Sequence, residues 1–272
     1  ERGLCYTPSA MAIPLIDVEP LRPVLAQSPL GLISDIDGTL SPIAPTPRET
    51  SVPEAIRHLL GGLLSRGVFV ALITGRTVAE ARGLVGLDGL AYAGNHGLSI
   101  WMDGREEVAP EAARYEDEAR RVLEELRGLN IPGVWLEDKG PVIGLHYRLA
   151  EDAAAARAAI LSEVQASPAA KRFRVVEGRM ILELRPPVAV DKGTALARLA
   201  QRWGLGGLLC LGDDTTDIDM FRSARELTGV GAACIAVESE EANSQVLAGA
   251  QYSVKGVGGV EWLLSEVLRA LP

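Results

Sequence analysis

The sequence predicts an α/β fold with a parallel sheet and a smaller inserted α+β domain. From residue 30 onward, apolar strand-like runs alternate with helical patterns, as in a parallel sheet with crossover helices. In the middle of the chain the order changes to helix, strand, strand, helix, strand, strand, which favours an antiparallel unit. We therefore expect an irregular lead-in at 1–29, a core at 30–103 and 187–272, and a cap domain at 104–186.

The lead-in is rich in proline, and we expect at most one short helix in it, around Val18 to Gln27. A Met first occurs at position 11, which places the first ten residues outside the expected folded unit. The N-terminus lacks a basic region followed by a continuous apolar stretch, so no secretory signal is expected.

The core is expected to contain strands at several apolar runs: Leu30–Ser34, Val68–Ile73, Leu90–Ala93 and Leu208–Leu211. Two helices are expected between them, at Pro53–Arg66, capped by Thr50 or Ser51, and at Gly193–Trp203. Each strand runs into a polar, glycine-flanked cluster, and open α/β sheets bind their ligands at the carboxyl ends of strands.

The middle of the chain begins with a hairpin-like stretch at 98–108. The elements expected after it are a charged helix at 111–127, strands at 134–137 and 142–149, an Ala-rich helix at 151–165, and strands at 173–177 and 180–184 joined by Gly178 and Arg179.

Composition limits the classes of partner. The chain has 272 residues, 47% of them hydrophobic, and 27 basic against 36 acidic residues give a formal charge of −9. This charge disfavours nucleic acid and anionic membranes as partners, and no run approaches the roughly 18 apolar residues of a membrane helix. Cys5, Cys210 and Cys234 are far apart and lack CxxC spacing, which favours neither a disulfide framework nor structural zinc and fits a reducing cytoplasm.

Two carboxylates stand two residues apart after the first core strand, in Asp35-Ile-Asp37-Gly38-Thr-Leu. Strand alternation lets both lean toward one cavity, while Gly38 allows a sharp turn. One carboxylate can attack phosphorus while the other handles protons, and together they favour a divalent cation. The alternative is an ordinary Asp-Gly turn, which the full hexapeptide behind an apolar strand makes the weaker interpretation. We therefore expect phosphoryl chemistry.

Three further groups extend this chemistry. Thr74 and the amide of Gly75 follow a strand and can donate hydrogen bonds to phosphoryl oxygens, unless they only form a turn. Lys192 precedes a helix, where anions are already favoured, although a lone lysine is usually a solvated surface charge. Three acids follow the last core strand: Asp213, Asp214 and Asp217. Carboxylates this close together repel one another without a cation, so they predict Mg²⁺. The alternative, acids that only stabilise a helix N-terminus, explains one or two of them but not all three.

In order, the strings around Asp35, Thr74, Lys192 and Asp213 resemble the four signature motifs of the haloacid-dehalogenase (HAD) phosphatase superfamily. The resemblance covers roughly residues 30–272 and implies a Rossmann-like HAD core with a cap inserted between the second and third motifs. The Asp-Asp-x-Thr-Asp form of the last motif is most similar to the trehalose-6-phosphate phosphatases. Two shorter strings share this similarity, Gly94-Asn-His-Gly97 and His146-Tyr-Arg148.

The resemblance implies roles for the matching residues. Asp35 is the expected nucleophile and Asp37 the expected acid and base, with Thr74 and Lys192 also catalytic. The implied Mg²⁺ ligands are Asp35, the backbone carbonyl of Asp37 and Asp213, with Asp214 or Asp217 as a further ligand or supporting partner. The expected substrate-binding residues are Gly75, Arg76, Asn95, His96, Glu137, Lys139, His146, Arg148, Glu183 and Arg185.

The cap residues among these resemble the sugar-contacting set of the family, since charged side chains hydrogen-bond hydroxyls well. Individually they also suit solvent-facing strand positions. The chain departs from the family pattern at Leu98 and Ser99, where a Glu is common after the His-Gly pair, and at Ile218, where Glu is usual. These departures affect the prediction of which sugar is bound more than the prediction of the phosphoryl chemistry.

The expected function is Mg²⁺-dependent hydrolysis of trehalose 6-phosphate through an aspartyl phosphate, with coupling to a trehalose-phosphate synthase implied. Alternatives are a phosphatase for sucrose, glucosylglycerol or mannosylglycerate phosphates, or a phosphomutase. A sugar-phosphate sensor without activity is the alternative from another class. It would have no need of the nucleophile, so the intact motifs argue against it.

Overall fold

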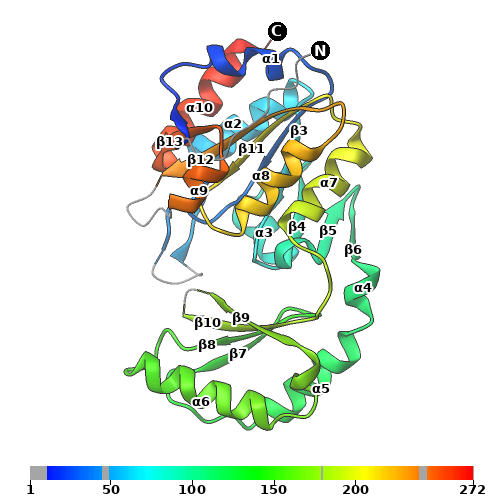
Figure 1. Cartoon of the computed structure of the whole chain (residues 1–272), viewed down its shortest axis with the longest axis vertical. Coiled ribbons are helices and arrows are strands. Elements are labelled where there is room, and N and C mark those ends of the chain that lie inside the picture. Colours follow the sequence, from blue (N-terminus) through cyan, green and yellow to red (C-terminus); the bar gives the residue numbers. More distant parts are fainter. Residues whose placement is uncertain (1–10, 45–48, 179, 239–243, 272) are drawn as a thin grey trace. The chain divides into compact units, whose positions relative to one another are not determined.

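The computed structural model describes residues 11–44, 49–178, 180–238 and 244–271 (Figure 1). Contacts divide the chain into two compact units, a core unit of Glu1–Glu107 with Val190–Pro272 and a cap unit of Val108–Ala189. The core unit extends past the expected boundary at residue 103 because the strand Arg105–Val108 joins the core sheet. Cys5, residues 45–48 and Arg179 lie outside the described residues.

The core sheet is mixed, with parallel pairing through its centre and an antiparallel pair where β5 meets β4. Its order among the described residues is β1 (Ile13–Pro14), β13 (Tyr252–Lys255), β12 (Gly231–Glu238), β11 (Gly207–Gly212), β2 (Leu30–Ser34), β3 (Phe69–Ile73), β4 (Ala91–Gly94), β5 (Ser99–Met102) and β6 (Arg105–Val108). The lead-in is less irregular than expected. It supplies β1, which pairs in parallel with β13, and the short helices η1 (Glu19–Leu21) and α1 (Arg22–Leu25).

Helices cover both faces of the core sheet (Figure 1). One layer contains α2 (Glu54–Ser65), α3 (Val78–Val85) and α10 (Gly256–Ala270), and the other contains α7 (Lys192–Trp203), α8 (Asp217–Glu226) and α9 (Ser244–Gly249). Strand alternation assigns side chains to the layers, since Leu32 packs with the first and Ile33 with the second. The predicted cap of α2 was wrong, because Pro53 occupies the N-cap without a side-chain bond.

The cap unit is an antiparallel sheet with helices on one face. The sheet order is β7 (Trp135–Asp138), β8 (Ile143–His146), β10 (Ile181–Arg185) and β9 (Arg174–Gly178), and the helices are α4 (Pro110–Ala113), α5 (Glu116–Leu126), α6 (Ala153–Ala166) and the short η4 (Ala170–Arg172). The helix expected at 111–127 is broken at Tyr115, whose ring packs edge-on against Phe173. Within the described part of the chain, no helix has the length and apolar character needed to cross a membrane.

Candidate active site

Four neighbouring parallel strands, β11, β2, β3 and β4, end at one edge of the core sheet (Figure 1). The residues that follow them are Asp213, Asp35, Thr74 and Asn95, respectively. The chain proceeds from β2 through β3 to β4 on one side, whereas β11 lies on the other side of β2. Open α/β sheets bind ligands where the strand order reverses in this way, so this edge is the candidate site.

Lys192 lies at the centre of the candidate site. Its Nζ donates to Asp35 Oδ1 at 2.8 Å and to Asp217 Oδ1 at 2.7 Å, and the residue is 3% exposed. Lys192 is the first residue of α7, whose N-cap Asp191 accepts a hydrogen bond from the amide of Thr194 and completes a capping box. The cap fixes where the helix begins, and therefore which residue presents its ammonium to the strand ends.

The electrostatics of this cluster are dominated by burial. Burial raises the pKa of the Asp35 carboxyl well above its usual range; Lys192 opposes this effect, and the charges of Asp217 and Asp213 add to it. Burial and the charge of Asp217 raise the pKa of Asp213 to about 7. For Lys192, burial lowers the pKa, but Asp217 and Asp35 outweigh it and the net shift is upward. One buried ammonium, bonded to Asp35 and Asp217, thus faces three carboxylates, and with all three ionised the surplus negative charge favours a bound cation.

The donor set fits a divalent metal ion. Asp35, Asp213 and Asp217 each offer a carboxylate oxygen, and these atoms lie within 4.8 Å of one another. Clustered carboxylate oxygens suit hard cations such as Mg²⁺. Gly38, at φ +87°, makes room for the cluster, because a Cβ there would stand 1.9 Å from Asp213 Oδ2.

The three carboxylates differ in how their oxygens are used. Asp217 is fully engaged, since Oδ1 accepts from Lys192 while Oδ2 accepts from the amides of Asp213 and Asp214 at 2.9 and 3.0 Å. Asp213 Oδ1 accepts from the hydroxyl of Thr39 at 2.9 Å. Asp217 therefore stabilises the loop that carries Asp213 and Asp214. Asp35 and Asp213 are the stronger candidates for metal ligands.

Asp214, an expected ligand, lies outside the three-carboxylate cluster found among the described residues. It is exposed, and its Oδ1 accepts from the Thr216 amide at 2.7 Å and from the Thr215 hydroxyl at 3.0 Å. These contacts shape the turn that precedes α8.

The Asp37 carboxylate points to a different partner. Arg76 binds it with both ends of its guanidinium, Nε to Oδ2 at 2.7 Å and Nη2 to Oδ1 at 2.6 Å. Nη2 of Arg76 also donates to the Thr50 hydroxyl at 2.8 Å. The bidentate pair fixes the orientation of Asp37. Thr50 was expected as a helix cap, and sequence spacing gave no signal for this contact.

The loops after β3 and β4 are tied together. The Thr74 hydroxyl accepts from the Arg76 amide at 3.2 Å and keeps its own proton to donate, and its carbonyl accepts from the His96 amide at 2.8 Å. Asn95 and His96 have φ values of 51° and 57°, which is uncommon for residues other than glycine. At Gly75 a Cβ would stand 2.6 Å from His96 Nε2, so the absence of a side chain there lets the imidazole approach.

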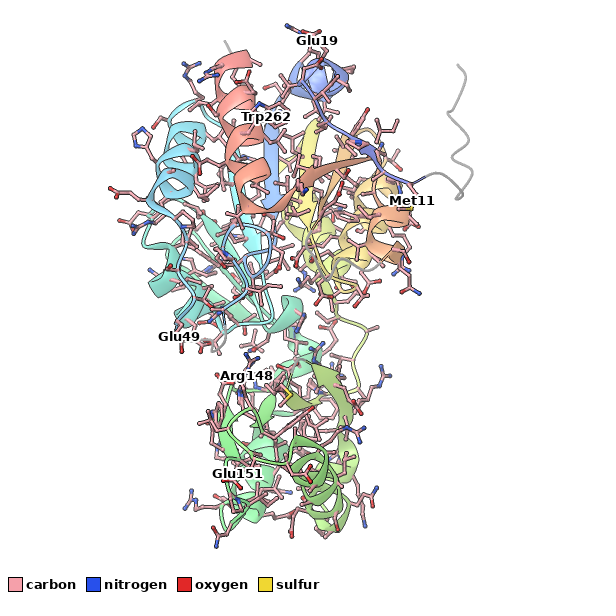
Figure 2. All side chains as sticks on the ribbon, turned by 90° about the vertical axis from the view of Figure 1, so that its left-hand side faces the viewer. Met11, Glu19, Glu49, Arg148, Glu151 and Trp262 are labelled. Atoms are coloured by element: carbon pink, nitrogen blue, oxygen red, sulfur yellow. The ribbon has the colours of Figure 1, made fainter. Side chains whose placement is uncertain are left out.

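On the cap unit, five of the expected sugar-binding residues form one network. Lys139 Nζ lies 3.0 Å from Glu183 Oε1 and 3.6 Å from Glu137 Oε2. Glu137 Oε2 also lies 2.6 Å from His146 Nε2, and Arg185 Nε donates to Glu183 Oε2 at 2.8 Å. Arg148, labelled in Figure 2, follows the end of β8, which is shorter than the strand expected at 142–149.

Strand register explains the network. Glu137 and Glu183 both pair with Gly144, one from β7 and the other from β10, so all three positions share a sheet face. The Glu137 carboxylate leans over the glycine, where a Cβ would lie 3.2 Å from Oε2.

A model of the trehalose-phosphatase family matches residues 33–255, a span that contains Asp35, Lys192 and Asp213. The chain belongs to the trehalose-phosphatase family.

Relatives of this trehalose-phosphatase family member differ in length. A probable trehalose-phosphate phosphatase of Sinorhizobium fredii is 35% identical over 205 residues, which cover 73% of this chain and 75% of the relative. An uncharacterized glycosyl hydrolase of Mycobacterium tuberculosis is 32% identical over 216 residues, which cover 72% of this chain but only 15% of that much longer protein.

Solved structures confirm the fold. The C-terminal domain of the C. albicans trehalose-6-phosphate phosphatase has a TM-score of 0.72 at 21% identity, covering 96% of this chain and 100% of that chain. A HAD sugar phosphatase also shares the fold, so the HAD core with an inserted α+β cap, expected from the motifs, is confirmed.

Proposed function

We propose that this protein hydrolyses trehalose 6-phosphate to trehalose and phosphate through an aspartyl-phosphate intermediate. The observation that carries the chemistry is the buried Asp35, held by Lys192 beside Asp213 at the carboxyl edge of the parallel sheet. The choice of substrate rests on the family and on the name of the Sinorhizobium relative.

In the first step a carboxylate oxygen of Asp35 attacks phosphorus, and the bond from phosphorus to the sugar oxygen breaks. Asp37 donates a proton to the departing sugar oxygen. In the second step Asp37 accepts a proton from water, whose oxygen attacks phosphorus and releases phosphate from Asp35. Thr74 and the Gly75 amide donate to the phosphoryl oxygens, and Lys192 neutralises charge on Asp35 and on the phosphoryl group.

In this proposal Arg76 binds the Asp37 carboxylate in the free enzyme and the phosphoryl group of the substrate when it arrives. Its bidentate pair with Asp37 holds that carboxylate in a fixed orientation. Phosphoryl oxygens offer the same planar two-point geometry to a guanidinium, so an arriving phosphate competes with Asp37 for Arg76. That competition releases Asp37 to carry the proton for the first step.

Mg²⁺ is the cofactor we propose, held by Asp35, Asp213 and the backbone carbonyl of Asp37. When bound, it supplies charge neutralisation at the phosphoryl group. Asp217 holds the Asp213 loop in position through its two backbone contacts.

The cap network suits an uncharged polyol. Two carboxylates, Glu137 and Glu183, are offset by Lys139 and Arg185, so the set is close to neutral, unlike the core cluster. Such groups hydrogen-bond hydroxyls as donors and acceptors. Leu98 and Ser99, where a Glu is common in the family pattern, supply no acid. Phosphates of other sugars are therefore the rivals to test. A cytoplasmic location and coupling to a trehalose-phosphate synthase stay predictions.

The decisive experiment is phosphate release from a panel of phosphorylated sugars, with Asp35→Asn as the blank. We expect trehalose 6-phosphate to give the highest kcat/KM. Higher activity on sucrose or glucosylglycerol phosphate would keep the chemistry and replace the substrate, whereas release of no phosphate from any sugar would refute the proposal.

A further inference from the structure

The cap sheet exposes an indole beside its charged network. Trp135 opens β7 and pairs in register with His146 of β8. The two rings are stacked, with centroids 4.5 Å apart and an interplanar angle of 2°. Trp135 is nevertheless 36% exposed, which is high for the largest side chain in the repertoire. Sequence reasoning passed over this residue.

Trp135 lies on the same sheet face as the network. Alternation places Trp135, Glu137 and Lys139 on one face of β7 and its extension. The alternate positions along the strands face the other side of the sheet, where Ile143, Leu145 and Leu182 pack against the cap helices. The indole is therefore not part of the cap core, and packing in that core does not explain why a tryptophan stands at this position.

His146 orients the indole. Its Nε2 lies 2.6 Å from Glu137 Oε2, which fixes the imidazole plane, and the imidazole covers one face of the Trp135 ring. A tryptophan anchored on one side and exposed on an edge strand offers a rigid apolar plate next to hydrogen-bonding groups. Ligand sites commonly combine such an aromatic wall with a few placed polar groups.

A pyranose ring has the complementary chemistry, with C–H groups on its ring faces and hydroxyls at its rim. We propose that Trp135 is a specificity-determining residue that stacks on the C–H face of a sugar ring whose hydroxyls bind Glu137, Lys139 and Glu183. His146 then acts as a positioning residue for the indole. This inference rests on the proposed function and adds the recognition of a ring to the recognition of hydroxyls.

The kinetic test compares trehalose 6-phosphate with acetyl phosphate, which has no ring to stack. In Trp135→Ala the ratio of the two kcat/KM values should fall about tenfold, mostly through KM for the sugar phosphate, and Trp135→Phe should recover most of the loss. Trp203→Ala is the matched control. Trp203 is 46% exposed and stacked on Phe69, but it ends α7, on the order of 16 Å along the helix from Lys192.

A binding readout separates stacking from a structural role. In the Asp35→Asn background, trehalose 6-phosphate should change the tryptophan fluorescence, and adding Trp135→Phe should remove that change while adding Trp203→Phe should not. An unchanged kinetic ratio in Trp135→Ala, or a fluorescence change that survives Trp135→Phe, would overturn the inference. If the wild type releases no phosphate from trehalose 6-phosphate, the proposed function itself fails; if it does and the Trp135 variants match it, only the stacking role fails.

Discussion

Each unit of the molecule places a lysine between two carboxylates, and the surroundings make the two sites different. In the core unit Lys192 lies 2.8 and 2.7 Å from Asp35 and Asp217, with a third carboxylate, Asp213, in the same cluster. In the cap unit Lys139 lies 3.0 and 3.6 Å from Glu183 and Glu137. There Arg185 supplies a second positive charge.

The difference is one of charge balance. With all three carboxylates ionised, the core cluster has a surplus of negative charge in a buried place, which favours binding of a cation and, through it, of a phosphoryl group. The cap network is close to neutral and includes an exposed aromatic ring, which favours an uncharged polar ligand. A lysine between two acids therefore indicates no function until the charges around it have been counted.

The largest effect should come from the proposed nucleophile. Asp35→Asn removes the carboxylate that attacks phosphorus in the proposed mechanism, so phosphate release should fall by roughly 10³-fold or more. The measurement is turnover of trehalose 6-phosphate by purified protein, with circular dichroism to check folding. Asp103→Asn, which changes an exposed acid paired with Arg202, is the control and should keep activity. Substantial turnover by Asp35→Asn would contradict covalent catalysis.

The metal should matter next, and its binding should depend on pH. With the pKa of Asp213 raised to about 7, a proton competes with the cation below that pH. The Kd for Mg²⁺, measured by calorimetry, should therefore rise about tenfold from pH 8 to pH 6. Chelator should stop turnover and Mg²⁺ should restore it.

Two controls sharpen the metal prediction. Asp213→Asn should abolish Mg²⁺ binding, whereas Asp214→Asn should change the Kd less than about threefold, because Asp214 lies outside the cluster. Equal effects of the two substitutions would refute the assignment of Asp213 as a ligand.

The stability of the metal-free protein should also depend on pH. Between about pH 4 and pH 7 the folded state keeps a proton on Asp213 that the unfolded chain has lost. The free energy of unfolding should therefore fall as the pH rises from about 4 to 7, and Mg²⁺ should reverse the loss at pH 8.

A smaller loss is expected when the orientation of Asp37 is disturbed. Arg76→Lys keeps the positive charge but cannot make the bidentate pair, so kcat should fall by about ten- to a hundredfold. Arg82→Lys is matched in chemistry, since Arg82 lies over the Trp101 ring rather than on a carboxylate. The idea fails if both variants have the kcat of the wild type.

The smallest effects should come from the cap network. Glu137→Ala or Lys139→Ala should reduce the ratio of kcat/KM for trehalose 6-phosphate to that for a small aryl phosphate by about tenfold, through lost charge-assisted hydrogen bonds. Lys171→Ala, at an exposed position of the cap unit, is the control. If both substrates lose activity equally, the network supports the fold rather than recognition.

The sequence predicts the core strands and the clusters that follow them well, because a buried parallel strand is a short apolar run and its carboxyl end is marked by glycine and aspartate. The bidentate pair of Arg76 with Asp37 could not be predicted, since it joins two loops whose conformations local patterns do not define. Glu137 and Lys139 were expected only from the family resemblance, and their meeting with Glu183 depends on register across β8. Asp213 and Asp214 look alike in sequence, whereas in the folded loop Asp213 is buried and Asp214 is exposed.

The bond from Lys192 to Asp35 spans 157 residues, and the whole cap unit is encoded between its two ends. The strand β11, which flanks β2, also comes after the cap. During synthesis the N-terminal part of a chain emerges first, so Asp35 is made long before Lys192. Closing so long a loop is slow relative to local folding. A growing chain therefore holds no complete Asp35–Lys192 pair until the cap sequence has been made.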